Sequence, residues 1–117
     1  MKLTKVRARR LRDIFYEIIA HYGESKFQTN FVELNVYHDE KIRLFGECEL
    51  DYDECSVNLA LCRTMKRAVE VLIEEYIHYL QSPTWYTRYD RMYGYWDNPY
   101  EIEAKRIAKR DAPMFLE

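Results

Sequence analysis

Three side chains between residues 74 and 78 form a group that could carry out acid–base or metal chemistry. Glu74 and His78 are four residues apart in the stretch IEEYIHYLQ, residues 73–81. On a helix this spacing places both side chains on one face, where they can share one ion. Glu75 lies about 100° further round the helix, where a carboxylate could take a proton from a reacting water. The stretch is therefore compatible with a helix that carries two metal ligands, Glu74 and His78, and a catalytic base, Glu75.

A metal site of this kind needs a third protein ligand from another part of the chain. The last helix begins with strong start signals, because Asn98 can cap it, Pro99 suits its first position and Glu101 can complete a capping box. We expect this capping role to turn Glu101 away, toward Lys105. Glu103 lies on the flank of the apolar face, where a carboxylate is costly unless it meets a cation or a metal. Glu103 is therefore the predicted third ligand, and pairing of Glu103 with an Arg at the rim is the alternative.

The acidic residues also have a simpler interpretation. The polar residues of this helix could form one solvated face opposite the core; they are Glu70, Glu74, Glu75, His78 and Gln81. Spacing alone favours this interpretation over a metal site.

The elements that must position these residues follow from the hydrophobic pattern. Apolar residues at intervals of three and four predict helices, and strict alternation predicts strands. The expected order is a helix over 3–22 ending at Gly23, strands near 31–37, 42–48 and 55–61, a helix over 64–80 closed by Pro83, an aromatic loop, and a closing helix from 98. Short turns between the strands predict a three-stranded antiparallel meander. The chain, residues 1–117, is thus predicted to be a single α+β domain.

Composition restricts the class of protein. The 117 residues are 48% hydrophobic with a net charge of −2, which argues against disorder and against a general attraction to nucleic acid or anionic lipid. No apolar run is long enough to span a membrane, and no secretory signal is recognisable, so we expect a cytoplasmic protein. Cys48, Cys55 and Cys62 fit no common zinc spacing and are expected to be reduced core residues.

Two further segments could bind partners. The first helix begins with a cluster of cations that could contact the phosphates of nucleic acid; these are Lys2, Lys5, Arg7, Arg9, Arg10 and Arg12. The predicted loop before the last helix is rich in aromatic residues; these are Trp85, Tyr86, Tyr89, Tyr93, Tyr95 and Trp96, followed by Tyr100. They could form a lid over the helix pair, a wall of a substrate cleft with a Tyr hydroxyl near the metal, or a surface on which bases stack.

Much of the chain resembles a known family. The stretch FGECELDYDECSVNLALCRTMKRAVEVLIEEYIHYLQ is similar to the core of small zincin-fold metallopeptidases, including the SprT-like group, in which a Gly-containing strand and an I-x-L-N-like strand precede an H-E-x-x-H helix. Here Gly46, Val57-Asn58-Leu59 and residues 74–78 stand in that order. The segment NPYEIEA resembles the E-x-E-A segment that supplies a Glu ligand in minimal, gluzincin-like members. The resemblance covers roughly residues 40–110. Separately, IEEYIHYLQSPTWYTRY (73–89) followed by NPYEIEAKR (98–106) is similar to small proteins of tailed phages, which would place the chain in a host cytoplasm.

The resemblance implies a function and a cofactor. It implies a metal-dependent peptidase that hydrolyses a peptide or protein substrate with Zn²⁺, with Mn²⁺ or Fe²⁺ as alternatives. Glu74 stands where the family has His, giving E-E-x-x-H, and Glu is itself able to ligate zinc. The other interpretation is a zincin fold kept as a non-catalytic binding module for a host protein or nucleic acid. The oligomeric state is not indicated by the sequence.

Overall fold

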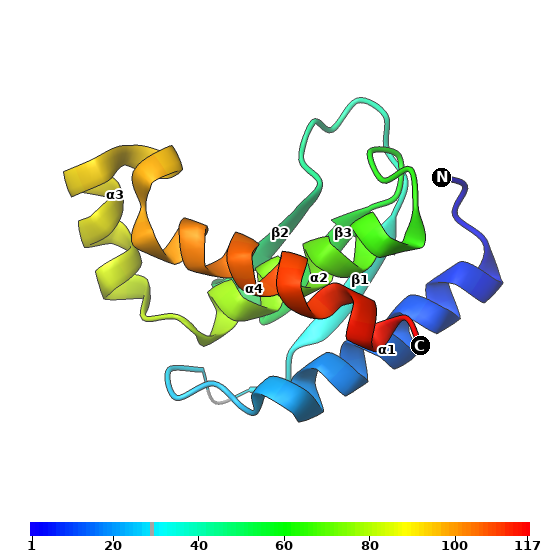
Figure 1. Cartoon of the computed structure of the whole chain (residues 1–117), viewed down its shortest axis with the longest axis horizontal. Helices are drawn as coiled ribbons and strands as arrows, with labels where there is room; N and C mark the ends of the chain where they lie inside the picture. The colour runs from blue at the N-terminus through cyan, green and yellow to red at the C-terminus, as the bar shows by residue number, and fades with distance from the viewer. Residues whose placement is uncertain (29) are drawn as a thin grey trace.

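The chain folds into four helices and one small sheet (Figure 1). The computed structural model describes residues 1–28 and 30–117. The elements in chain order are α1 (Lys5–Tyr22), β1 (Glu33–Tyr37), β2 (Gly46–Glu49), a 3₁₀ turn η1 (Leu50–Tyr52), β3 (Glu54–Asn58), α2 (Met65–Leu80), α3 (Pro83–Asp97) and α4 (Pro99–Phe115). The predicted α+β class is confirmed, and helix α2 contains the three residues of the candidate site.

Local capping signals explain where the long helices begin. Thr4 and Thr64 cap α1 and α2, each accepting a hydrogen bond from the backbone N–H three residues later. Asn98 caps α4 through the N–H of Tyr100, with Pro99 at the first helical position, as the sequence predicted. Gly23 ends α1 with a φ of 86°, a conformation that glycine adopts without steric cost. These boundaries depend on neighbouring residues, which is why the sequence predicts them well.

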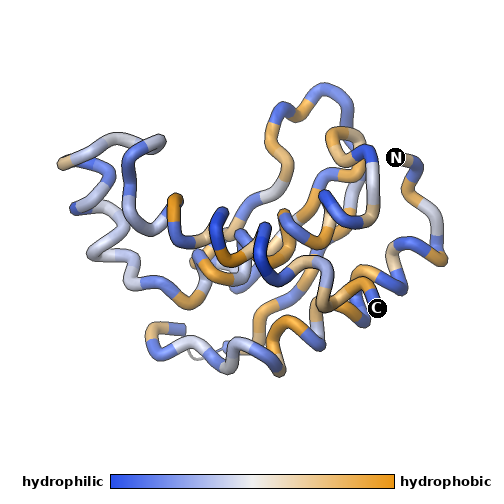
Figure 2. Tube along the Cα trace, viewed as in Figure 1, coloured by the Kyte–Doolittle hydropathy of each residue, from blue (hydrophilic) through white to orange (hydrophobic). Residues whose placement is uncertain are grey.

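Helix α2 is the centre of the core. It packs against β2 and β3 on one side and against α4 on another, while α1 packs against α2 and β1 (Figure 1). Apolar residues are buried around most of its circumference, a pattern typical of a central helix; they are Ala68, Val69, Val71, Leu72, Ile73, Tyr76, Ile77 and Tyr79. The polar residues of α2 lie together on one side of the helix and stay at least partly accessible; they include Glu74, Glu75 and His78. In Figure 2 the apolar residues are concentrated on the segments that pack together here.

The sheet is mixed, so the predicted antiparallel meander is wrong. The strand order is β1-β3-β2, with β1 parallel to β3 and β2 antiparallel to β3. The chain leaves β1, crosses to the far edge to form β2, and returns through η1 to place β3 between the two. The second strand accordingly begins at Gly46 rather than at residue 42, because residues 38–45 are needed for the crossing. This arrangement leaves β2 at an edge of the sheet, next to α2.

The side chain of Asn58 holds the crossing segment in place. It is fully buried, it accepts hydrogen bonds from the N–H groups of Asp39 and Ala60, and it donates to the carbonyls of Asp39 and Ile42. A buried amide that makes four hydrogen bonds replaces the ladder that a tight hairpin would have supplied. Asn58 therefore helps to determine where β2 begins.

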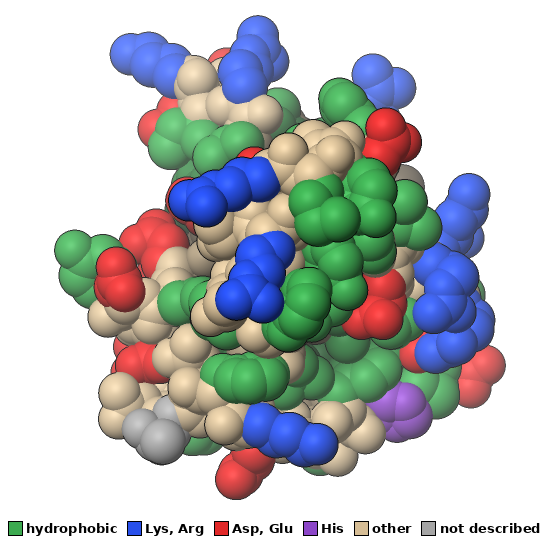
Figure 3. All heavy atoms as spheres, turned by 90° about the vertical axis from the view of Figure 1, so that its left-hand side faces the viewer, with side chains coloured by type: hydrophobic (Ala, Val, Ile, Leu, Met, Phe, Trp, Pro, Cys, Tyr) green, Lys and Arg blue, Asp and Glu red, His purple; other side chains and the backbone are tan. Residues whose placement is uncertain are grey.

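The aromatic segment is a helix, so the predicted loop over residues 84–96 is also wrong. Ser82 caps α3 and Pro83 occupies its first turn, where proline is favourable, and a non-helical Gly94 (φ 78°) kinks the helix near its end. No residue of α3 is buried, which explains the lack of a periodic apolar signal. The helix projects from the body of the molecule at the left of Figure 1, and Figure 3 shows hydrophobic, Arg and Lys side chains on this end.

The basic half of α1 lies on the surface. Lys5, Arg9, Arg10 and Arg12 are exposed, and Arg7 donates to the carbonyl of Lys2. The predicted contact of these cations with nucleic acid stays a prediction. Within the described residues, no helix has both the length and the apolar character needed to cross a bilayer.

Close packing of β2 on α2 gives a first prediction. A methyl group added at Gly46 would lie 2.4 Å from the backbone oxygen of Ser56 and 2.6 Å from Cγ1 of Val71. Because the backbone oxygen belongs to the neighbouring strand, we expect Gly46→Ala to lower the free energy of unfolding by about 1–3 kcal/mol in urea denaturation. Glu47→Ala, at the next and exposed position, should change it by less than about 0.5 kcal/mol. Equal midpoints for the two variants would contradict the close approach.

Candidate functional site

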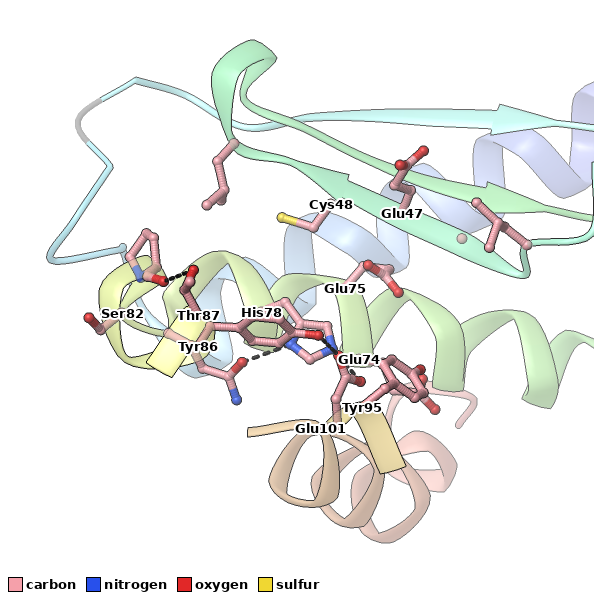
Figure 4. Close-up of a pocket in the computed structure, with 15 residues that line it drawn as sticks. Glu47, Cys48, Glu74, Glu75, His78, Ser82, Tyr86, Thr87, Tyr95 and Glu101 are labelled. Atoms are coloured by element: carbon pink, nitrogen blue, oxygen red, sulfur yellow. Dashed lines mark hydrogen bonds and ion pairs between the residues drawn. The ribbon is translucent and has the colours of Figure 1, made fainter. Parts of the chain in front are cut away.

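The three acid–base residues of α2 face a cavity of about 510 Å³ (Figure 4). Strand β2 forms one wall, the start of α3 forms another, and the first turn of α4 closes the site below α2. The polar residues that line it are Glu47, Cys48, Glu74, Glu75, His78, Gln81, Ser82, Tyr86, Thr87, Tyr95 and Glu101. The expectation of a solvated surface face therefore does not describe these residues, because the side chains of Glu74 and His78 are only 16% and 15% exposed.

His78 is held at both ring nitrogens. Nδ1 lies 2.7 Å from Oε1 of Gln81, and Nε2 lies 3.1 Å from Oε1 of Glu101. An amide oxygen only accepts, so Nδ1 carries the proton that it donates to Gln81. Gln81 is itself fixed, since its amide donates to the carbonyl of Tyr100 at 2.9 Å. With its pKa raised to about 9, His78 also carries a proton on Nε2, which it donates to Glu101. Loss of that proton would leave the Nε2 lone pair in the position that a metal-ligating histidine requires.

Glu101, not Glu103, meets His78. Glu101 is 5% exposed and its carboxylate contacts Nε2 of His78, the hydroxyl of Tyr86 and Nζ of Lys105. Burial opposes its charge, but hydrogen bonds from His78, Tyr86 and Lys105 outweigh burial and lower its pKa to about 2. The sequence-based expectation that Glu101 turns away is wrong: Asn98 caps α4 alone, and the carboxylate of Glu101 is free to cross to α2.

Glu103 lies one contact away from the histidine. It accepts a hydrogen bond from Nε2 of Gln81 at 3.3 Å, so it touches the residue that orients His78 rather than His78 itself. The alternative expectation, an ion pair between Glu103 and an Arg, does not occur among the described residues. Glu103 therefore lies beside the candidate site and reaches His78 only through Gln81.

A stripe of small residues could have shown the orientation of α4. The buried residues of this helix recur at intervals of three and four; they are Glu101, Ala104, Ala108, Ala112 and Phe115. Three alanines allow α4 to lie close to α2, so the buried face starts at Glu101. The prediction from sequence placed Tyr100 and Ile107 on the buried face of α4, but both are only partly buried. An uninterrupted alanine stripe at helical spacing was the missed signal.

Glu74 already has a cationic partner. Oε1 of Glu74 lies 3.6 Å from the guanidinium of Arg67, which also contacts Glu70 at 3.3 Å. Burial raises the pKa of Glu74, while Arg67, Lys105 and His78 counteract part of that rise. Glu74 is on the same side of α2 as His78, as the spacing predicted, but its carboxylate forms an ion pair with Arg67.

Glu75 faces the cavity beneath β2. Figure 4 shows its carboxylate between Cys48 and the strip of α2 that carries His78, and no dashed line reaches it. Burial raises the pKa of Glu75 to about 7, helped by the negative charges of Glu74, Glu101 and Glu47 and opposed by His78. A carboxylate that titrates near neutrality can both accept and return a proton.

The donor set fits a divalent ion in part. His78 Nε2 and Glu101 Oε1 are 3.1 Å apart, a separation that two ligands about 2.0–2.2 Å from one ion can have. Glu74 would have to leave Arg67 to become the third ligand. Accordingly, no three His, Cys, Asp or Glu side chains among residues 1–28 and 30–117 already stand together as a ready-made metal group.

No family model, no curated protein and no solved structure gives a significant match to this chain.

The contact with Glu101 gives a prediction about His78. Burial alone would lower the pKa of His78, but the hydrogen bond and charge of Glu101, then Gln81 and Glu75, raise it from 6.5 to about 9. In chelator-treated protein, we expect Glu101→Gln to move the pKa of His78 from about 9 toward 6.5 in an NMR titration of the imidazole. The protonated imidazole stabilises the folded state fully below pH 6.5, and this contribution is lost as the pH rises through 9.

Glu103→Gln is the matched control, since it removes a carboxylate two residues away that does not touch the ring. It should leave the pKa of His78 close to that of the unmodified protein. A larger shift in the Glu103 variant than in the Glu101 variant would contradict the orientation of α4.

Proposed function

We propose that this cavity is the active site of a metal-dependent hydrolase that cleaves peptide bonds. The observation that carries the proposal is the convergence of Nε2 of His78 and the carboxylate of Glu101, with Nδ1 of the histidine held by Gln81. Glu75 lies beside them and has no hydrogen-bond or ion-pair partner among the described residues. His78, Glu101 and Glu74 would hold the ion. Glu101 thus takes the ligand role that the sequence suggested for Glu103.

One imidazole and two carboxylates suit Zn²⁺, and the same donors also suit Mn²⁺ or Fe²⁺. When bound, such an ion would supply Lewis acidity that polarises the substrate carbonyl and makes water more acidic. The chain's part is to supply ligands of the correct tautomer and charge, and to keep them buried.

Glu75 would be the general base. Its carboxylate would take a proton from the attacking water and pass it to the leaving amine, a role that its partial burial between β2 and α2 supports. Tyr86 would keep Glu101 oriented, because its hydroxyl donates to Oε2 and leaves Oε1 directed toward His78. In this arrangement Tyr86 positions a ligand instead of contacting the substrate carbonyl.

The sheet supports an extended peptide as the substrate. Strand β2 is an edge strand and lines the cavity, so its free backbone groups could pair with a peptide laid alongside it. Gly46 and Cys48 lie two residues apart on the face of β2 that is turned toward α2. A peptide paired with β2 would therefore lie close to Glu75 and His78, which line the same cavity. We also propose a cytoplasmic location, since all three cysteines are free thiols, as expected in a reducing compartment.

A second candidate function is a peptide-binding module without catalysis. The observation that favours it is that two of the three carboxylates already have cations, Arg67 for Glu74 and Lys105 for Glu101. The same groove and edge strand would then bind a partner protein with no chemistry. Metal binding separates the two candidates.

We expect protein purified without chelator to take up one divalent ion per chain when Zn²⁺, Mn²⁺ or Fe²⁺ is offered, measured by elemental analysis after desalting. His78→Ala and Glu101→Gln should abolish stoichiometric uptake because each removes a ligand. Glu103→Gln is the matched control and should retain the ion. Absence of uptake by the unmodified protein with all three metals would exclude the hydrolase and leave the binding module.

Glu75→Gln tests the base separately. This variant should keep its metal and lose about 10²–10⁴-fold in the turnover of a fluorogenic peptide library, because amide replaces the proton acceptor. Unchanged turnover, with metal retained, would remove Glu75 from the proposed role. A loss of metal as well as turnover would instead place Glu75 among the ligands.

A further inference from the structure

Two cysteines lie directly opposite each other on neighbouring strands in the wall of the cavity. Cys48 on β2 pairs in register with Cys55 on β3, and both are free thiols. Cys48 is partly exposed and lines the cavity, whereas Cys55 is fully buried between the sheet and α2. Figure 4 shows the sulfur of Cys48 projecting from β2 into the space above α2.

The hydrogen-bond pattern tells which kind of pair this is. The N–H of Asn58 donates to the carbonyl of Phe45, so Phe45 and Asn58 form a hydrogen-bonded pair. The next pair along the ladder is Gly46 with Val57, and Cys48 with Cys55 lies two pairs further on. Bonded and non-bonded pairs alternate along an antiparallel ladder. The pair formed by Cys48 and Cys55 is therefore a non-hydrogen-bonded one, in which the side chains approach most closely.

This geometry allows a disulfide without movement of the backbone. Cα atoms in a non-hydrogen-bonded pair are about 4.5 Å apart, and disulfides join residues whose Cα atoms are about 4.4–6.8 Å apart. The separation expected for this pair lies within that range, so the bond can form. The Cys48 thiol, followed by burial, raises the pKa of Cys55, which is consistent with two sulfurs in contact. Cys48, the thiol open to the cavity, is accordingly the one that a reagent reaches first.

We propose that Cys48 and Cys55 are a redox-active pair that small disulfides of the glutathione type oxidise reversibly through the cavity. The Cys48 thiolate attacks one sulfur of the small disulfide, forming a mixed disulfide and releasing one small thiol. The Cys55 thiolate then attacks the Cys48 sulfur and releases the second small thiol. In total the two protein thiols lose two electrons and two protons, and the small disulfide gains them.

Oxidation changes the cavity at its wall. Since Cys55 is buried under the sheet, the bond draws the sulfur of Cys48 back from the cavity and removes its thiol from the neighbourhood of Glu75. The inference rests on the strand register and not on the proposed hydrolase, so it holds for a metal-free binding groove as well.

The test is a thiol count combined with peptide mapping of the native, unmodified protein after treatment with oxidised glutathione. We expect the number of titratable thiols to fall from three to one, with a Cys48–Cys55 link found by mass spectrometry and three thiols restored by dithiothreitol. Cys62, which lies beyond the end of β3, should remain free. Three thiols remaining, or a link that includes Cys62, would overturn the proposal.

Two variants make the order of events visible. Cys55→Ser should accumulate one glutathione on Cys48, because the second thiol that releases it is absent. Cys62→Ser is the matched control, which should form the same link as the unmodified protein and retain no free thiol. Glutathione on Cys62 instead of Cys48 in the Cys55 variant would contradict access through the cavity. If the Cys55 variant does not fold, the map of the unmodified protein still decides the proposal.

Discussion

The close packing of α2 on two sides is the constraint on which the rest of the structure depends. On one side, Gly46 lets β2 approach Val71 and Glu75, since any larger residue would meet the backbone of β3. On the other, the alanine stripe of α4 lets that helix lie against α2. Both approaches use small residues, and together they enclose the only polar strip of α2. The cavity is therefore a direct product of the core packing.

The sequence predicts those features that local interactions determine. Caps at Thr64 and Asn98 and the glycine at 23 determine helix ends within one turn, and their signals lie within a few residues. The mixed sheet could not be predicted in the same way, because the pairing of β1 with β3 joins residues that are far apart in the chain. Two short turns are compatible with a meander, and only the long-range contacts of Asn58 distinguish the crossing from a hairpin. Helix α3 has no buried residues, so its sequence lacks the apolar periodicity from which a helix could have been predicted.

In the candidate site, too, local features could be predicted from the sequence and features that depend on long-range packing could not. Spacing alone puts Glu74 and His78 on one side of α2, because both belong to a single helix. Choosing between Glu101 and Glu103 requires the rotation of α4 relative to α2, which is a property of packing between helices. The two glutamates are two residues apart and point about 200° apart around the helix, so a different choice of apolar face exchanges their roles. The sequence places Tyr86 in a possible cleft wall, but it does not show that Tyr86 orients Glu101 or that Gln81 orients His78, because both roles depend on those same contacts.

Charge compensation explains how such an acidic cavity is stable in the absence of an ion. Glu101 is buried, and a buried carboxylate is costly unless it is paired and hydrogen-bonded. Here His78, Tyr86 and Lys105 all contact it, and Arg67 approaches Glu74. Folding of α2 and α4 against each other therefore does not require a metal. The same contacts already hold the ring of His78 and the carboxylate of Glu101 in position. An incoming cation would therefore displace the Nε2 proton of His78 and the partly exposed cations Lys105 and Arg67. A cavity whose carboxylates are paired with protein cations, and whose histidine and glutamate are already oriented, is compatible with both proposed functions.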